Sequence, residues 1–273
     1  MPAQRQNRKI TLRLGLFGVC VVVIFREPTL TCMPAYFLRA KWKNLIMANY
    51  AVDPALLMPY LPPGTELDFH QGNTYLSLVG FLFAKTRILG IPIPRLGTFE
   101  EINLRFYVLR REGKSVRRGV VFIREFVPYK SVARIANRFY HEHYEVSPTH
   151  HVWTKDVHEK QISYLWRKSG RWNMLKVHAE SKPVPMPIGS FEEFIFEHYW
   201  GFVKRSDNET VMYQVAHPRW MIHPVRQQEI DCRFGAIYGD AFSVLDGQAP
   251  HSVMLARGSD VLVPWKRERI ILP

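Results

Sequence analysis

Alternating hydrophobic and polar positions between Phe99 and Lys130 predict a β-hairpin. In its first arm four apolar residues alternate with four more polar ones, Ile102, Leu104, Phe106 and Val108 with Glu101, Asn103, Arg105 and Tyr107. A repeat of two residues indicates a strand with one apolar and one polar face. Glu112 and Gly113 supply the turn, and Val120 to Val127 forms a second arm that is apolar on both faces until Arg124 and Glu125. We expect this second arm to be covered on both sides.

Charged residues on this hairpin mark the first candidate site. Removing a charge from water costs several kcal/mol per ion unless the charge is paired. Glu101, Arg105, Arg124 and Glu125 should therefore pair with one another or face a polar cavity. Two interpretations stay open: an ion-pair network that fixes the strand register, and a ligand site to which Asn103 also contributes.

Shorter patterns predict the remaining elements. Three short helices are expected: one opened by Asp53 and Pro54, one over Ser131–Tyr140, and one begun by a capping box of Ser190 and Glu193. Strands are expected at 66–69, 75–83, around Tyr144, and at 151–154, 162–166, 175–179, 198–204, 211–216, 253–256 and 261–263. The stretches from Tyr144 to residue 179 are expected to continue the sheet of the hairpin. Proline in Ile91-Pro92-Ile93-Pro94 excludes a central strand, so Lys85 to Thr98 is predicted to be a loop. The fold class is α+β, mainly antiparallel β.

Composition favours a globular protein of a reducing compartment. The chain has 273 residues, of which 47% are hydrophobic, so it can bury a sizeable core. Its three cysteines are too few and too scattered for a disulfide framework or a cysteine-based zinc site, which favours the cytoplasm. The net charge is +13. The densest basic run, Arg110 to Arg118, falls on the hairpin turn without interleaved aromatic residues, so a solvated surface is favoured over a nucleic-acid site.

Residues 1–32 form a separate leader. Basic residues precede an uncharged run from Leu14 to Phe25, a pattern that resembles a secretory signal. As a helix the run would reach about 18 Å, whereas a bilayer core is roughly 30 Å thick. We therefore expect no stable membrane anchor. Secretion, peripheral membrane association and a natural start at Met33 stay open, and one folded domain is expected over residues 33–273.

No motif points to a metal or a cofactor. Five histidines occur between His141 and His158, but His-Glu-His at 141–143 lacks the spacing of a His-Glu-x-x-His helix. Surface or packed histidines are the favoured interpretation. The chain also contains no nucleophile elbow, phosphate loop or dinucleotide fingerprint. We expect neither a metal nor a cofactor.

Several segments resemble the bacterial YqjF-like family of uncharacterised proteins (DUF2071). The segments are Trp42-Lys-Asn-Leu45, Asn49-Tyr50-Ala-Val-Asp53-Pro54, Leu61-Pro-Pro-Gly64-Thr-Glu-Leu-Asp68, Tyr75-Leu-Ser-Leu-Val-Gly-Phe81, the hairpin from Phe99 to Pro128, Glu193-Phe-Ile-Phe-Glu-His-Tyr-Trp-Gly201 and His217-Pro-Arg-Trp220. The resemblance implies an acetoacetate-decarboxylase-like fold. In that fold a cone-shaped, mostly antiparallel β-barrel with a few flanking helices encloses a small-molecule cavity.

The resemblance also draws attention to Lys130. Acetoacetate decarboxylases condense a neutral lysine amine with a ketone. In that family the lysine follows an Arg-Glu strand end, which Arg124-Glu125 resembles, so Lys130 and Glu125 are the catalytic candidates. The family's second lysine is replaced by Ser131, although Arg134 could supply a cation. We predict that Lys130 does not form a Schiff base.

The sequence thus predicts a pocket for a small carboxylated or carbonyl-bearing molecule, in a binding protein or a lyase-like enzyme. Glu101, Asn103, Arg105, Arg124 and Glu125 would form its floor, with arginine clamping a carboxylate. The alternative is a non-catalytic interaction or nucleic-acid-binding protein that uses the Arg110 to Arg118 tip. The oligomeric state stays open.

Overall fold

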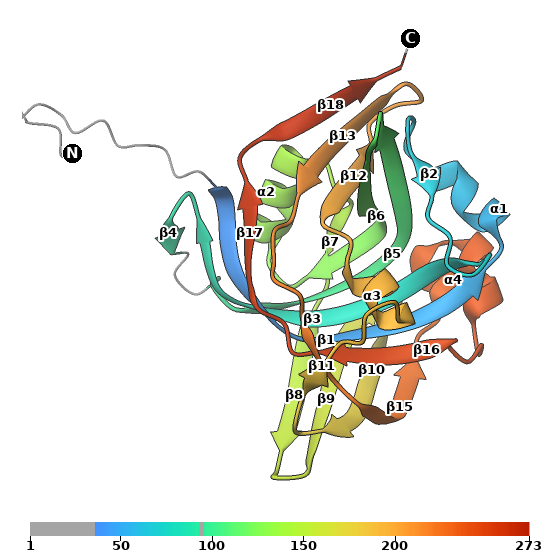
Figure 1. Ribbon diagram of the computed structural model, residues 1–273. Helices are drawn as coiled ribbons and strands as arrows, with labels where there is room; N and C mark the ends of the chain where they lie inside the picture. The colour runs from blue at the N-terminus through green and yellow to red at the C-terminus, as the bar shows by residue number, and fades with distance from the viewer. Residues whose placement is uncertain (1–35, 93–95, 273) are drawn as a thin grey trace, which may run out of the picture. The chain divides into compact units, whose positions relative to one another are not determined.

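The structure, a computed structural model, describes residues 36–92 and 96–272 (Figure 1). The expectations for residues 1–32 lie outside these ranges. Most described residues belong to antiparallel strands, and the helices are few and short. The expected class, α+β with mainly antiparallel β, is confirmed.

A 14-stranded sheet contains most of the strands. Its central path is β11-β14-β16-β1-β3-β5-β6-β12-β13-β18, and β2, β4, β7 and β17 pair beside that path. The bounds are β1 Tyr36–Val52, β2 Glu66–Leu67, β3 Thr74–Ile88, β4 Ile91–Pro92, β5 Phe99–Glu112, β6 Ser115–Val127, β7 Tyr144–Val146, β11 Val184–Pro185, β12 Trp200–Lys204, β13 Glu209–Gln214, β14 Met221–His223, β16 Ser252–Ala256, β17 Asp260–Pro264 and β18 Arg267–Ile271.

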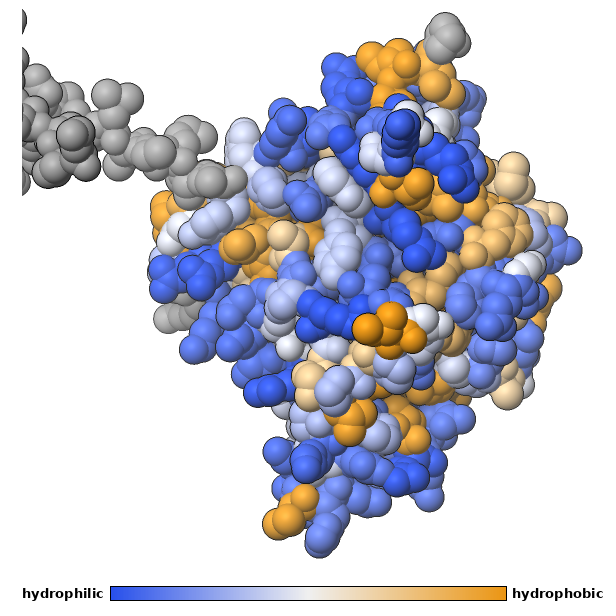
Figure 2. All heavy atoms as spheres, in the orientation of Figure 1, coloured by the Kyte–Doolittle hydropathy of each residue, from blue (hydrophilic) through white to orange (hydrophobic). Residues whose placement is uncertain are grey.

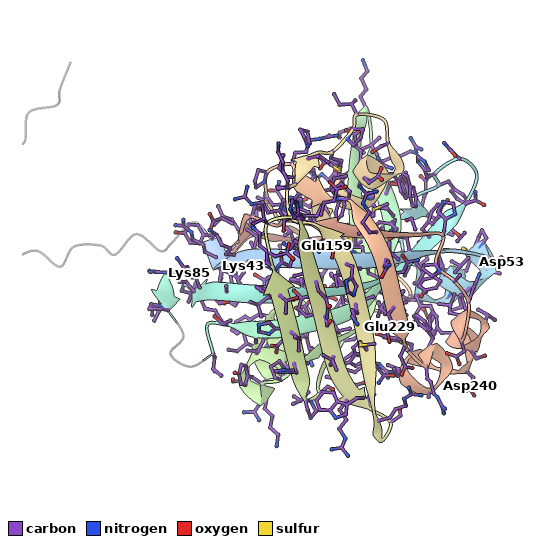
Figure 3. All side chains as sticks on the ribbon, turned by 90° about the horizontal axis from the view of Figure 1, so that it is seen from below. Lys43, Asp53, Lys85, Glu159, Glu229 and Asp240 are labelled. Atoms are coloured by element: carbon purple, nitrogen blue, oxygen red, sulfur yellow. The ribbon has the colours of Figure 1, made fainter. Side chains whose placement is uncertain are left out.

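A separate 4-stranded sheet has the order β15-β10-β9-β8. Its strands are β8 Thr149–Lys155, β9 Glu159–Lys168, β10 Arg171–Glu180 and β15 Val225–Asp231. Figure 3 shows this sheet in front of β1 and β3, with its strands crossing theirs. The sequence patterns predicted β8, β9 and β10 but placed them in the same sheet as the hairpin. That expectation is wrong, because β10 pairs with β9 and with β15, some fifty residues further along the chain.

Short helices connect the strands. They are α1 Pro54–Leu57, α2 Lys130–Tyr140, α3 Phe191–Phe196 and α4 Phe234–Tyr238, with 3-10 turns η1 Met58–Tyr60 and η2 Asp240–Leu245. The predicted caps of α1 and α3 are confirmed: the Asp53 carboxylate accepts from Ala55 N at 2.8 Å, and Ser190 Oγ accepts from Glu193 N at 3.2 Å. The helix α2 was also predicted. The α4–η2 pair was not.

The expected closed barrel is not found, since in residues 36–92 and 96–272 both sheets are open. The two regions of the large sheet that approach each other, near β13 and β17, meet at a single bridge between Ala216 and Leu262. One bridge supplies two backbone hydrogen bonds, of 2.8 and 2.9 Å, and no continuing ladder. The barrel therefore lacks the continuous pairing that would close it.

The predicted hairpin is β5 and β6, whose register runs from Ile102 opposite Phe126 to Glu112 opposite Ser115. The predicted loop between Lys85 and Thr98 is partly wrong. The strand β3 continues to Ile88, and β4 pairs with it at two positions. Proline is tolerated there because β4 lies at the edge of the sheet.

The two faces of β5 have different surroundings. Ile102, Leu104 and Phe106 belong to the core between the large sheet and the small one, with Tyr164, Trp166 and other residues of the small sheet. Residues at the alternate positions point to the other side, where a second apolar cluster contains Phe81, Phe83 and Phe99. The alternation of β5 thus directs its polar residues away from the core between the sheets.

The face seen in Figure 2 is mostly hydrophilic, and its hydrophobic residues occur in separate groups, as is ordinary for a protein surface. Within residues 36–92 and 96–272, we find no helix whose length and apolar character would allow it to cross a membrane.

Candidate functional site

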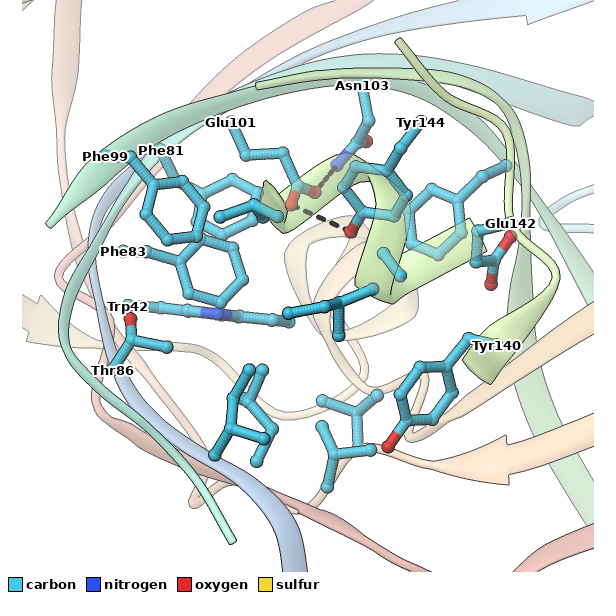
Figure 4. A pocket seen from close by; sticks show the side chains of 18 of the residues that line it. Trp42, Phe81, Phe83, Thr86, Phe99, Glu101, Asn103, Tyr140, Glu142 and Tyr144 are labelled. Carbon is cyan, nitrogen blue, oxygen red and sulfur yellow. Dashed lines mark hydrogen bonds between the residues drawn. The ribbon is translucent and has the colours of Figure 1, made fainter. Parts of the chain in front are cut away.

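A cavity of about 130 Å³ lies between the large sheet and α2. Its walls come from β1, β3, β5, β6, α2, β7, β13 and β17, and most of the side chains that line it are apolar. Trp42, Phe81, Phe83 and Phe99 form an aromatic wall (Figure 4). The volume corresponds to roughly ten water positions. The cavity suits a small molecule with an apolar body.

Polar groups gather at one end of the cavity. Glu101 Oε1 accepts a hydrogen bond from Asn103 Nδ2 at 3.0 Å, and Glu101 Oε2 accepts one from Tyr144 Oη at 2.9 Å (Figure 4). Glu142 lines the same cavity, and its Oε1 accepts from Tyr213 Oη at 2.5 Å. Each of these carboxyl groups therefore has a fixed orientation.

The carboxyl groups of Glu101, Glu125 and Glu142 are buried near one another. Burial raises the pKa of Glu101, and it raises that of Glu142 to about 8. The pKa of Glu125 lies well above its usual value, because of burial and of repulsion from Glu142 and Glu101. Three such groups cannot all ionise in a buried site without large cost. At least part of the cluster is protonated at neutral pH and can donate hydrogen bonds or a proton.

The guanidinium of Arg105 lines the cavity beside this cluster, although Arg105 is only 9% exposed. Among the described residues no carboxylate oxygen lies within 4.0 Å of it, and its Nε has no hydrogen-bond acceptor. Its side-chain contacts are weak ones, from Nη2 to Met47 Sδ at 3.5 Å and from the guanidinium carbon to the centroid of the Tyr107 ring at 5.8 Å. A buried arginine of this kind can bind an anionic group of a ligand.

Local backbone geometry brings these residues together. Glu101, Asn103 and Arg105 alternate along β5 and so share one face. Asn103 is directly opposite Glu125 on β6, and Glu125 is in parallel register with Tyr144 on β7. The segment between α2 and β7 carries Glu142. It begins at His141, which ends α2 in the left-handed conformation, with φ 62°.

The structure unites part of the predicted pocket floor. Glu101, Asn103 and Arg105 line the cavity, and Glu125 lies beside them. Arg124 does not, and this corrects the expected floor. Adjacent residues of a strand point to opposite faces, so Arg124 and Glu125 cannot both enter the cavity. Arg124 instead donates to Ile237 O at 2.5 Å and pairs with Glu145 at 3.1 Å.

Lys130 is the first residue of α2, and its side chain is exposed. The α2 residues that line the cavity are Ser131, Val132, Ile135, Ala136 and Tyr140, without Lys130. The catalytic roles suggested for Lys130 and Glu125 stay predictions.

Sequence reasoning missed Glu142, Tyr144 and Tyr213. Glu142 and Tyr144 belong to the His-Glu-His-Tyr segment, which drew attention only as a metal candidate. Tyr213 is 71 residues from the Glu142 that it contacts, and no local pattern links the two. Within the described ranges no group of three or more His, Cys, Asp or Glu side chains is arranged to hold a metal ion.

Comparison with known proteins identifies the family. The sequence model of DUF2071, described as an uncharacterized conserved protein, matches residues 39–260. The chain belongs to the DUF2071 family. Its relative YqjF of Bacillus subtilis (strain 168), also described as uncharacterized, is 29% identical over 166 residues, which are 60% of this chain and 64% of YqjF. The match thus spans slightly less than two thirds of the length of that relative.

Solved structures of low sequence identity share the fold of this DUF2071 protein. Acetoacetate decarboxylase from Legionella pneumophila has a TM-score of 0.60 at 13% identity, with 91% of this chain and 93% of that chain covered. The enduracididine biosynthesis enzyme MppR, complexed with pyruvate, has a TM-score of 0.57 at 13% identity, with 88% and 93% covered. The fold is therefore acetoacetate-decarboxylase-like, as the resemblance implied.

Proposed function

We propose that this protein binds a small organic acid, with a carboxylate or carbonyl group and an apolar body, in the cavity beside Arg105. The observation that carries the proposal is the buried Arg105 guanidinium, which lines an apolar cavity and has no carboxylate partner among the described residues. A ligand carboxylate would supply that partner, and a charge-assisted pair in a buried site is strong.

The acidic cluster would complete recognition of the ligand. A protonated Glu101 or Glu142 can donate to a carbonyl oxygen, whereas an ionised carboxylate would repel a ligand acid. The same groups could deliver a proton in a lyase-like reaction, because their raised pKa values approach neutrality. The related fold of MppR, solved with the small keto acid pyruvate, supports this ligand class.

The alternative of a nucleic-acid site at the hairpin tip has less support. Three arginines of the Arg110 to Arg118 run form ion pairs whose arginine side chains are no more than 37% exposed: Arg110 with Glu112, Arg117 with Glu268 and Arg118 with Asp68. Cations already paired with carboxylates are less available to phosphates.

Calorimetric titration with pyruvate, acetoacetate and phenylpyruvate tests the proposal. For at least one of these acids we expect Arg105→Met to weaken binding thirtyfold or more, a loss of about 2 kcal/mol. The matched control is Arg111→Met, which removes an arginine that is 60% exposed in its side chain and should change binding less than about twofold. Equal affinities of wild type and the folded Arg105→Met protein would overturn the proposal.

A further inference from the structure

A second hollow, the groove, lies where the small sheet meets β1 and the turn between β16 and β17. It has a volume of about 750 Å³, and most of the residues that line it belong to the segments 41–44, 153–160, 218–223 and 257–260. Figure 3 labels Lys43 on β1 and Glu159 at the start of β9, and a hydrogen bond from Lys160 to Asn44 joins these two strands. Trp42 lines both the groove and the cavity described above.

The groove is strongly basic. Six basic side chains line it, and Asp260 is the acidic one: Lys41, Lys43, Lys155, Lys160, Arg219 and Arg257. Arg219 pairs with Glu193. For the other five, the described part of the chain offers no carboxylate within 4.0 Å. Several cations on different segments thus converge on one space in which Asp260 is the acidic side chain.

Lys160 is the buried member of this set, with 8% of its surface exposed. Its Nζ donates to Asn44 Oδ1 at 2.8 Å and lies 3.4 Å from His223 Nε2. His223 Nδ1 lies 2.8 Å from Glu180 O, so Nδ1 carries the proton and Nε2 is an acceptor. An ammonium has three donors, and this geometry occupies two of them. Among the described residues Nζ has no further hydrogen-bond partner, so a third donor can serve a ligand.

The backbone around Lys160 is shaped to hold this arrangement. Asn44 has φ 51° and lies in the irregularity of β1 between Lys43 and Ile46, which directs its amide to Lys160. Bulges of this kind re-aim side chains and are frequent beside functional sites. Gly258 approaches so closely that an added Cβ would lie 2.2 Å from Trp42 O.

Two tryptophans add aromatic surface. Trp42 and Trp153 line the groove, and the indole N–H of each is buried without an acceptor among the described residues. An indole nitrogen is a donor only. The groove therefore combines cations and aromatic surface.

We propose that this groove is a second ligand site, which binds a small organic phosphate carrying at least two negative charges, with Lys160 as its buried contact. Five cations without an ion-pair partner among the described residues match a multiply charged anion better than a single carboxylate. Lysine binds phosphate as a point charge, and the volume lies within the range of small-molecule sites. The site shares Trp42 with the proposed acid-binding cavity but does not include Arg105.

Titration with pyrophosphate as the probe tests this site. We expect Lys160→Met to weaken pyrophosphate binding about tenfold or more. The control Lys114→Gln removes the same charge from the exposed hairpin turn and should change the dissociation constant less than about twofold. The double variant Lys43→Gln/Lys155→Gln changes only side chains that reach water, so it should fold, and we expect about fivefold weaker binding.

The outcomes separate this site from the cavity. Loss of pyrophosphate binding in Lys160→Met, with unchanged organic-acid binding, supports the proposal. If Lys160→Met fails to fold, the double variant decides. Affinities that fall equally in the groove variants and in Lys114→Gln would overturn the proposal, since they would show a general charge effect. Tighter Lys160-dependent binding of a single-stranded oligonucleotide of about 12 nucleotides would overturn its small-ligand part.

Discussion

The cavity and the groove share Trp42 as a wall, yet their ionisable groups differ. The cavity contains carboxyl groups that are largely neutral, whereas the groove contains basic groups that are charged. In the cavity, burial and mutual repulsion raise the pKa values of Glu125 and its neighbours, so protonation removes much of their charge. In the groove, burial beside Lys155 and Arg257 lowers the pKa of Lys160 to about 8, so it still carries a proton at neutral pH. The open groove also lets water solvate the remaining cations.

The comparison shows two ways in which one fold accommodates buried ionisable groups. Enclosed groups lose their charge, whereas groups at an open boundary keep it and can attract a ligand of opposite charge. Arg105 is the exception, because it lies in the enclosed region and an arginine cannot lose its proton. That contrast is the reason for assigning the anion contact of the cavity to Arg105.

The largest effect is expected at the wall of the groove. Gly258→Ala should cost about 1 to 2 kcal/mol for its left-handed backbone and about 1 to 3 kcal/mol more for the overlap with Trp42 O. Gly247→Ala is the control, because Gly247 has a similar φ of +75° with no atom within 4 Å of its added Cβ. Urea unfolding measures both variants. An equal loss of unfolding free energy in the two variants would show that the backbone at Trp42 shifts to make room for the added Cβ, so that the close contact of Gly258 is not required.

A smaller effect is expected from the acidic cluster. Burial raises the pKa of Glu142 to about 8 in the folded protein, whereas the pKa of a glutamate in the unfolded chain is about 4.3. Between these two pH values the folded protein holds a proton that the unfolded chain has released. Stability should therefore fall as pH rises, by about 2 kcal/mol between pH 6.5 and 8. Below that interval the buried His198 has the opposite effect, because its pKa is lowered from 6.5 to about 4 and stability therefore rises with pH between these values.

The test compares the pH dependence of unfolding in wild type and Glu142→Gln. The neutral variant should lose most of the decline between pH 6.5 and 8. Glu229→Gln is the control at an exposed carboxylate that pairs with Lys176, and it should keep the decline. A wild-type curve that rises or stays flat across this interval would show that Glu142 is ionised in the folded protein.

The smallest effect is expected at Lys130, which belongs to neither region. Its exposed position leaves no burial to favour the neutral amine that an imine requires. Lys130→Gln should change the binding of organic acids less than about twofold. Incubation with acetoacetate and borohydride, followed by peptide mapping, should leave Lys130 unmodified. Stoichiometric labelling at this position, lost in Lys130→Gln, would instead indicate decarboxylase-type chemistry.

The sequence predicted what depends on neighbouring residues. The alternation along β5 placed Glu101, Asn103 and Arg105 on one face, and the capping residues of α1 and α3 defined the starts of those helices. The same rule of alternation, applied to Arg124 and Glu125, would have removed Arg124 from the pocket floor.

Features built by distant residues could not be predicted in this way. Asn44 and Lys160 are 116 residues apart, and Lys43 and Asn44 interrupt the apolar pattern of β1 where its register shifts. The separate small sheet depends on pairing of β10 with β15, for which neither strand carries a local signal. The cavity, the groove and the incomplete closure of the barrel all arise from such long-range pairing.

The pairing of β1 with β16 and β17 has a consequence for the synthesis of this protein. Residues 45–49 pair with residues 252–256, so the partner of Asn49 is Ser252, 203 residues later. At a translation rate of about 5 to 20 residues per second, one edge of β1 waits roughly 10 to 40 s on the ribosome before its partner exists. Such an unpaired edge is prone to aggregation, and nascent chains of this protein should therefore depend on chaperones until the final strands emerge.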